Sequence, residues 1–473
     1  MPTDIKALVA RRLGENYDLH DKHVNRTLVK VQRTIGFDKV YARAKGAYLY
    51  DQEGRDYLDF LSGFGVFAMG RNHPAIRTAI QDVLDLDLPN MVQMDCAFLA
   101  GILAEKIVGR LAAQGAPHLD AVFLCNSGTE AVEGALKFAR AATSRPRIIA
   151  LKNSYHGLSY GSLSVTGNPF FHEGFGPFLP GVVHVPMGDI AALATELAQN
   201  DVAALIVEPV QGKGVKWPAN NYYNQAQALC RRHGTLLICD EVQTGLGRTG
   251  RWFAFEHWDL EPDIITLAKA LSGGYAPCAA IVARRSIYQS VFPRLDRCVV
   301  HSSTFGRNNL AAAAGIASLD VIHDEGLVEN AAKMGEILEE RLLQLQARHE
   351  VLSDIRIKGL MCAFEMSAPR SFLPRMGWKL YHSMDGGLFP QLVVTPLLQK
   401  HRILTQVAAH STDIVKFLPP LIIGEREIDR FCSALDDVLT GLWRLPGPLA
   451  DVARNFFRSS GKGSPIRPQL QRM

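Results

Sequence analysis

Seven short apolar segments, each followed by a stretch of helical character, constrain the fold of this 473-residue chain more than any other feature. Strands of a parallel sheet are covered on both faces, so their sequences are almost continuously apolar. The alternation of such strands with helices predicts an α/β domain in which helices sandwich a mostly parallel sheet. The predicted strands are residues 121–125, 148–151, 182–185, 203–207, 235–239, 264–267 and 279–282.

The parts of the chain on either side have other patterns. The first 45 residues are polar and compatible with helices, and "GAYLYDQEGRDYLDFLSG" predicts a hairpin around "QEG". A long helical region is predicted over residues 308–349, followed by a smaller α+β unit in the order strand, helix, strand, helix. Residues 446–473 are basic, and we expect a solvated extension there rather than a contact for an acidic partner.

Composition excludes several classes of function. A net charge of +4 on a chain of this size is too small to indicate a nucleic acid or an anionic membrane as partner. No apolar stretch approaches the length that spans a bilayer, and the first residues lack the apolar core of a signal peptide. The fifteen histidines show no metal-ligand spacing, so no metal site is expected. Eight cysteines without CxxC pairs favour a reducing compartment, and we expect the cytoplasm.

Polar residues follow the first predicted strand at its carboxyl end, where open α/β sheets bind their ligands. Ser127, Gly128 and Thr129 stand there and open a helix. Their backbone N–H groups and the helix dipole are able to bind an anion. Ser and Thr are also favoured at helix starts as simple N-caps, so a phosphate role and a capping role both stay open.

An acid and a lysine stand in the corresponding places of two later strands. Asp240 follows residues 235–239, and a buried carboxylate there needs a partner, most commonly a cap or a salt bridge. Lys269 follows residues 264–267, and its amine either reaches solvent or is desolvated, which makes it a Schiff-base candidate. A phosphate cradle, an acid and a lysine in this order form the set that holds pyridoxal phosphate (PLP) at its phosphate, ring nitrogen and aldehyde.

Six ordered motifs carry a resemblance to a known family: "NSGTEAVEGALKFAR", "SYHGLSYGSLSVTG", "IVEPVQG", "LLICDEVQTGLGRTG", "PDIITLAKALSGG" and "STFGRN". The chain resembles the class III PLP-dependent aminotransferases over roughly residues 35–440. "LDFLSGFGVFAMGRNHP" and "KFLPPLIIGEREID" extend the match at both ends. The resemblance implies fold type I, with a large PLP-binding domain at residues 81–335 and a smaller α+β domain formed by residues 1–80 and 336–445.

The resemblance also implies roles for individual residues. Lys269 would form the Schiff base with PLP, and Asp240 would pair with the protonated ring nitrogen. The family builds its sites across a homodimer interface, so we expect a dimer or a dimer of dimers. The other implied contacts, to the phosphate and around the ring, are Ser127, Gly128, Thr129, Tyr155, His156, Glu208 and Gln243, and Thr304 from the neighbouring subunit.

The implied activity is transfer of an amino group from a primary amine to a 2-oxo acid such as pyruvate or 2-oxoglutarate. An aminomutase or racemase on the same scaffold would use Lys269 and Asp240 alike and is the alternative. A non-catalytic scaffold protein is disfavoured, because the lysine, the acid and the phosphate loop are all retained. "GLGRTG" at residues 245–250 matches a dinucleotide-binding pattern, but no amphipathic helix pattern follows it, which argues against that interpretation.

Departures from the family pattern bear on the substrate. Many relatives that use ω-amino acids carry a glutamate and an arginine where this chain has Lys213 and Lys416, and two lysines cannot form that switch. Arg307, where relatives often have glycine, is a candidate for an extra anion contact. The segment "FLSGFGVFAMGRNHP", most similar to a subgroup acting on diamines such as putrescine, and Trp217 favour a diamine, a long-chain amine or an ω-amino acid. Phe64 and Phe67 border the substrate or pack in the core, and both interpretations stay open.

Overall fold

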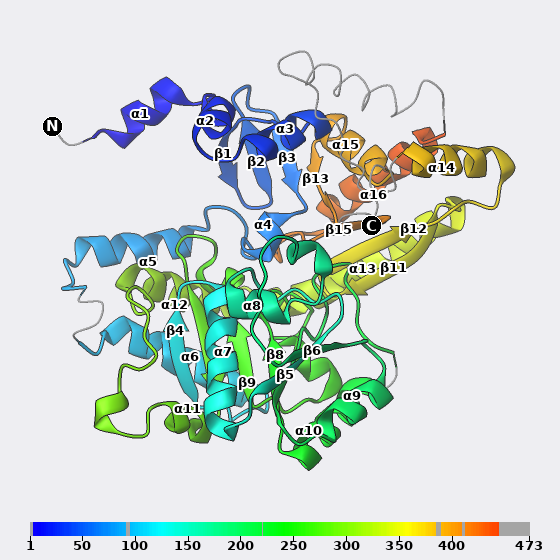
Figure 1. Ribbon diagram of the computed structural model, residues 1–473. Coiled ribbons are helices and arrows are strands. Elements are labelled where there is room, and N and C mark those ends of the chain that lie inside the picture. Colours follow the sequence, from blue (N-terminus) through cyan, green and yellow to red (C-terminus); the bar gives the residue numbers. More distant parts are fainter. Residues whose placement is uncertain (1–2, 91–94, 220, 385–388, 409–411, 444–473) are drawn as a thin grey trace.

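The computed structural model describes residues 3–90, 95–219, 221–384, 389–408 and 412–443 (Figure 1). Its centre is a seven-stranded sheet in the order β4-β10-β9-β8-β7-β5-β6. Strands β5 to β9 run parallel to their neighbours in this group, and β10 is antiparallel to both β4 and β9. The strands are β4 (Ala121–Cys125), β5 (Arg147–Leu151), β6 (Val182–Val185), β7 (Val202–Val207), β8 (Leu236–Asp240), β9 (Ile264–Leu267) and β10 (Ala279–Ala283).

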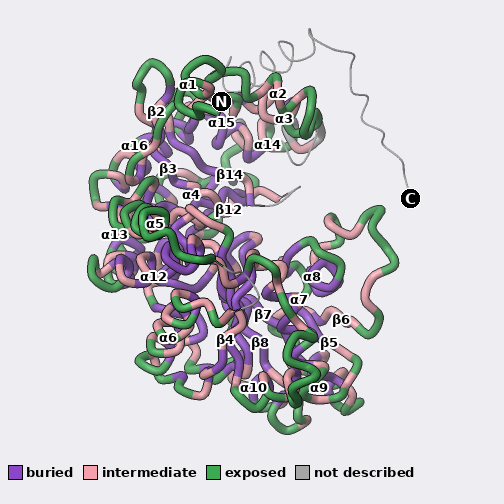
Figure 2. Tube along the Cα trace, turned by 90° about the vertical axis from the view of Figure 1, so that its left-hand side faces the viewer, coloured by how far each residue is buried: buried purple, intermediate pink, exposed green. Residues whose placement is uncertain are grey.

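The sheet is covered on both faces, which confirms the predicted α/β architecture. All six residues of β7 are buried, and alternate side chains enter different core clusters. Leu205 belongs to the cluster that includes residues of α6 and α12, whereas Ile206 belongs to the cluster that includes residues of α7. Figure 2 shows the buried trace concentrated in these strands. Because every strand is apolar along its length, the predicted bounds are correct to within one residue at each end.

Helices α4 to α13 follow along the chain, and the last of them, α13, packs mainly against β11 (Leu352–Lys358). The bounds are α4 (Ser62–Gly65), α5 (Pro74–Asp85), α6 (Phe98–Ala113), α7 (Gly128–Thr143), α8 (Tyr160–Val165), α9 (Ile190–Leu197), α10 (Tyr222–His233), α11 (Arg285–Val291), α12 (Asn309–Asp324) and α13 (Leu327–Arg348). The long helical region predicted over residues 308–349 is thus two helices, which separate at Gly326 with its left-handed φ of 62°.

Described segments from the N-terminal and the C-terminal parts of the chain pack together in a second layer beside the large sheet (Figure 1). The predicted hairpin is present as β2 and β3, and β13 from the C-terminal part pairs in parallel with β3. The sheet order is β1-β2-β3-β13, and β1 was not predicted. The bounds are α1 (Ile5–Arg12), α2 (Asn16–His23), α3 (Arg26–Ile35), β1 (Tyr41–Lys45), β2 (Tyr48–Asp51), β3 (Asp56–Asp59) and β13 (Ile403–Leu404).

A third sheet, in the order β11-β12-β15-β14, completes this layer. The segment "IRIKGLMCAFEM", predicted as one strand, is a hairpin of β11 and β12 that turns at Gly359, whose φ is 54°. Helix α14 was not predicted. The bounds are β11 (Leu352–Lys358), β12 (Met361–Met366), α14 (Phe372–Met384), α15 (Gln391–Gln399), β14 (Gln406–Val407), β15 (Ile414–Phe417) and α16 (Glu425–Gly441).

Domain boundaries at residues 80 and 335 stay predictions, and the predicted tail at residues 446–473 lies outside the described residues. Within the described ranges, no helix is both long and apolar enough to cross a membrane.

Arg248 ties the loop after β8 to the smaller layer. Its side chain is buried, and Nη1 donates to the carbonyl oxygens of Leu360 (3.0 Å) and Pro419 (2.5 Å). A buried guanidinium bound to two carbonyls is costly to move, because its donors would lose their partners. The loop that follows Asp240 is therefore fixed against the C-terminal strands.

Glu241, the residue after Asp240, is a buried carboxylate with a role in stability. It accepts a hydrogen bond from the N–H of Phe255 (2.8 Å) and one from the hydroxyl of Thr244. Burial raises the pKa of Glu241 to about 7, although both hydrogen bonds oppose the shift. The folded protein thus binds this proton more tightly than the unfolded chain does.

We expect Glu241 to make stability fall as pH rises. A carboxyl whose folded pKa is raised stabilises the fold below the unfolded pKa, and this contribution is lost as pH rises to about 7. Glu241→Gln imitates the protonated form at every pH. In urea denaturation, its free energy of unfolding relative to wild type should increase between pH 5 and pH 8 by up to about 3 kcal/mol. Glu173→Gln, at an exposed position, is the control and should show no such trend. A pH-independent difference for Glu241→Gln would refute this role.

Candidate active site

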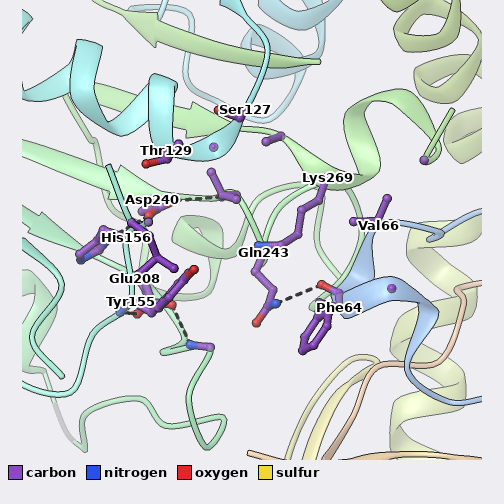
Figure 3. A pocket seen from close by; sticks show the side chains of 18 of the residues that line it. Phe64, Val66, Ser127, Thr129, Tyr155, His156, Glu208, Asp240, Gln243 and Lys269 are labelled. Carbon is purple, nitrogen blue, oxygen red and sulfur yellow. Dashed lines mark hydrogen bonds and ion pairs between the residues drawn. The ribbon is translucent and has the colours of Figure 1, made fainter. Parts of the chain in front are cut away.

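A cavity of about 860 Å³ opens at the carboxyl ends of β4, β8 and β9 (Figure 3). In Figure 3, Ser127 and Thr129 lie at the start of α7, with Asp240, His156, Glu208 and Tyr155 along one side. Lys269, Gln243, Phe64 and Val66 lie along the other. The sheet thus brings together residues that are far apart in the sequence, as the strand-end pattern predicted.

The start of α7 is held by its own side chains. Ser127 is the N-cap, and its hydroxyl accepts from the N–H of Glu130 (3.3 Å). Thr129 accepts from the N–H of Ser159 (3.1 Å). A Cβ on Gly128 would lie 2.8 Å from Val242, so a larger residue does not fit there. Ser127 therefore has the simple capping role, and the same helix start faces the cavity with its N–H groups, as an anion site requires.

Asp240 is a buried carboxylate whose oxygens are bound from three directions. Oδ1 accepts from the N–H of Val242 (3.1 Å) and the hydroxyl of Thr266 (2.9 Å). Oδ2 lies 2.8 Å from Nδ1 of His156, whose Nε2 is buried and has no partner among the described residues. His156 therefore orients the carboxylate, and the carboxylate fixes the imidazole.

Lys269 lies two residues after the end of β9 and has an unusual backbone. Its φ is 49°, in the left-handed region that residues other than glycine rarely adopt. Its amine lines the cavity and makes no hydrogen bond or ion pair with any described residue. Burial lowers the pKa of Lys269, while Asp240 and Glu208 oppose this shift. Such an amine is available as a nucleophile or base.

Glu208 fixes two loops that border the cavity. Oε1 accepts from the N–H of Tyr155 (2.8 Å), and Oε2 accepts from the N–H of Gly212 (2.7 Å). Burial raises the pKa of Glu208, while His156 and the two N–H groups oppose the shift. The ring of Tyr155 packs edge-on against Phe171, with centroids 5.3 Å apart. Glu208 thus positions the Tyr155 ring through the backbone.

Gln243 links the two layers of the molecule across the cavity. Its Nε2 donates to the carbonyl oxygen of Phe64 (3.0 Å), and its Oε1 accepts from Nζ of Lys416 (2.6 Å). Phe64 is half exposed and, like Val66, lines the cavity. Sequence reasoning suggested Gln243 as a cofactor contact, but no local signal pointed to its partners, which lie in α4 and β15.

Four predicted site residues do not line this cavity, and one of them, Arg307, donates instead to the carbonyl oxygen of Asp95 (3.2 Å). Thr304 is exposed outside it. Phe67 packs on Gly63 and Gly274, with the Arg71 guanidinium 3.7 Å from its ring centroid. Trp217 packs against a buried cluster that includes Val210 and Met361, and Nζ of Lys358 lies 4.8 Å from its ring centroid. Among the described residues, no group of three or more potential metal ligands occurs.

The sequence of this chain matches a known protein family. The family model for aminotransferase class-III matches residues 31–439. The chain belongs to the class III aminotransferases. Their cofactor is PLP, and the fold is that of the fold type I enzymes.

Among relatives of this class III chain, the aminotransferase PigE of Serratia sp. is 36% identical, covering 90% of this chain and 53% of PigE. The chain thus spans about half the length of PigE. An acetylornithine aminotransferase of Caldanaerobacter subterraneus is 37% identical (84% of this chain, 94% of the relative), and a putrescine aminotransferase of Pectobacterium atrosepticum is 36% identical (89% and 87%). Matches named acetylornithine or ornithine aminotransferase outnumber those named putrescine aminotransferase.

A solved structure shows the same class III fold. It is an ornithine aminotransferase of Toxoplasma gondii with partial occupancy of PLP at its active site. It superimposes with a TM-score of 0.80 at 28% identity, covering 93% of this chain and 99% of that structure.

The residues of this class III cavity fit PLP. The start of α7 offers N–H groups to a phosphate, and the buried Asp240 offers a carboxylate to a protonated ring nitrogen. The unpartnered amine of Lys269 is suited to an aldehyde carbon. Sequence reasoning found these three groups, but it missed the direct contact between His156 and Asp240, because the two residues are 84 positions apart.

Proposed function

We propose that this class III aminotransferase moves an amino group from a primary amine without an α-carboxylate to a 2-oxo acid, and that Lys269 holds the cofactor. The observation that carries the proposal is the amine of Lys269, which lies unpartnered in the cavity on a strained backbone and with a lowered pKa. Bound PLP supplies an electron sink that makes a proton on the carbon beside the substrate nitrogen removable.

Each cavity residue then has a task. The amine of Lys269 would hold the cofactor at its aldehyde carbon and would move a proton on and off the substrate carbon. The Asp240 carboxylate keeps a proton on the ring nitrogen, oriented by His156 at 2.8 Å. The N–H groups of Ser127, Gly128 and Thr129 bind the phosphate. Tyr155 covers a ring face, and Glu208 and Gln243 hold the surrounding loops.

The lining of the cavity supports a donor with a mainly apolar chain and no carboxylate on the carbon that carries its amine. Much of the wall is aromatic or aliphatic, including Phe64, Val66, Tyr155 and Phe171. No arginine of the described chain lines it, although arginine is the side chain that binds a carboxylate with two parallel hydrogen bonds. We therefore propose a diamine, a long-chain amine or an ω-amino acid as the donor, with pyruvate or 2-oxoglutarate as acceptor.

A titration of the purified protein with primary amines tests this function. We expect a visible absorption band from Lys269-bound cofactor, converted by diamines or long-chain amines to a near-ultraviolet band and restored by a 2-oxo acid. The α-amino acid that corresponds to the accepted 2-oxo acid should convert it as well, because it runs the second half-reaction in reverse.

Matched variants make this experiment decisive. Lys269→Ala should abolish the visible band, whereas Lys152→Ala, at an exposed lysine outside the cavity, should keep it. A wild-type band that no amine converts would contradict the proposed donor class. Racemisation, or migration of an amino group without any 2-oxo acid, would instead identify an isomerase.

We also propose that two copies of the chain assemble through the surface around residues 295–307. Large apolar side chains are exposed there, with Leu295 at 94%, Val299 at 71% and Phe305 at 62%. A groove of about 880 Å³ beside them is lined by Phe98 and Val299, among others. Contiguous exposed apolar surface is typical of a subunit interface. Asn126 donates to Ser303 (2.7 Å), so this surface adjoins the phosphate loop, and Thr304 would serve the neighbouring cavity.

Charges on this surface should break the assembly. The wild-type chain should sediment at twice the mass of one chain or more. Leu295→Asp combined with Val299→Asp would bury two unpaired carboxylates and should weaken association at least about 100-fold, with loss of cofactor affinity. Leu343→Asp, at a position 50% exposed on α13, is the control and should remain associated. If the double variant sediments like wild type, the interface lies elsewhere.

The cytoplasm is the proposed location. All eight cysteines are unpaired, and six of them are buried. Unpaired cysteines of this kind are common in reducing compartments.

A further inference from the structure

The two lysines in place of the expected acid and arginine have different surroundings. Lys416 is buried, and its Nζ donates to the carbonyl oxygen of Gly212 (2.5 Å) and to Oε1 of Gln243 (2.6 Å). Burial and the nearby charges of Lys269, Lys213 and Arg248 lower the pKa of Lys416 well below its usual value, against the effect of Glu208. Lys416 therefore connects β15 to two loops of the large sheet, and two of its donors are already in use.

Lys213 is half-buried and points its charge at aromatic rings. Nζ lies 5.4 Å from the ring centroid of Tyr155 and 5.1 Å from that of Phe171. It makes no hydrogen bond or ion pair with a described residue. Glu208 is the carboxylate that acts on it, but both of its oxygens already accept backbone N–H groups. Three ammonium donors thus remain available at the cavity wall.

Other cations near the cavity are not available. The Arg248 guanidinium is bound to the carbonyl oxygens of Leu360 and Pro419 and does not line the cavity. Lys269 is reserved for the cofactor in the proposed function. Lys213 is then the one cation of the described lining that can meet a carboxylate without breaking a hydrogen bond.

We propose that Lys213 binds the carboxylate of the 2-oxo acid and that Lys416 is a positioning residue for Gln243 and the Gly212 turn. This inference rests on the proposed transaminase function. Aromatic faces attract a cation but provide no conventional hydrogen-bond acceptor. Lys213 therefore rests over Tyr155 and Phe171 while an amine without a carboxylate occupies the cavity. A carboxylate offers a charge-assisted hydrogen bond, and the flexible four-carbon stem lets the ammonium move to it. Lys213 thus acts in the 2-oxo-acid half-reaction and makes no contact with the amine donor in the other.

The test compares the two half-reactions in cofactor-loaded variants. In Lys213→Met, which keeps the length and apolar stem, kcat/KM for the amine donor should stay within about twofold of wild type. For pyruvate or 2-oxoglutarate it should fall about 10- to 100-fold, mainly through KM, because a charge-assisted bond is lost. Lys213→Arg should restore most of this loss. Equal losses in both half-reactions would show that Lys213 only supports the loop.

Equilibrium binding gives a readout independent of turnover. Propionate and glutarate, which cannot be aminated, should bind wild type with a calorimetric Kd about 10-fold or more below that of Lys213→Met. Equal affinities would overturn the role of Lys213. If wild type converts no amine, the proposed function fails, and this measurement still decides whether Lys213 binds carboxylates.

Lys416→Met separates binding from positioning. Because Gln243 would lose the donor to its Oε1, we expect a shifted visible absorption band and a fall in kcat for both half-reactions, with carboxylate affinity changed less than about threefold. A loss confined to 2-oxo acids, with an unchanged band, would assign the carboxylate to Lys416 and overturn the proposal.

Discussion

The buried carboxylate of Asp240 is the interaction on which the geometry of the site depends. It stands at the end of β8, in the interior of a sheet that is covered on both faces. An unpaired charge there would cost several kcal/mol. Its hydrogen bonds come from Thr266 on β9, from the N–H of Val242 and from His156 in the loop after β5. Satisfying this one charge therefore fixes three segments of the chain relative to one another.

The strain at Lys269 also follows from the structure that surrounds it. A left-handed conformation at a lysine costs about 1–3 kcal/mol and persists only where the surroundings determine it. Here β9 is paired with β10 up to Leu267 and with β8 up to Thr266, and Ala268 and Ala270 on either side of the lysine are buried. The backbone has no room to relax, so the side chain is directed into the cavity. Strain, isolation and a lowered pKa thus occur at the same residue.

Features that depend on neighbouring residues could be predicted from the sequence, whereas features that depend on residues far apart in the chain could not. The strands of the large sheet were predictable because local hydrophobicity reports burial on both faces. Ser127, Asp240 and Lys269 were predictable because each lies within two residues of the end of such a strand. Strand β13 was not, because two residues such as Ile403 and Leu404 become a strand only through pairing with β3. The contact of Lys416 with Gln243 spans 173 positions and leaves no local pattern.

The cavity lining contains more lysines than carboxylates. Three lysines (Lys213, Lys269 and Lys416) line the cavity against two carboxylates (Glu208 and Asp240), and burial lowers the pKa of each lysine. The charges of Lys213 and Lys269 lower the pKa of Lys416 further. A phosphate or a carboxylate in the cavity relieves this repulsion and favours the ammonium forms.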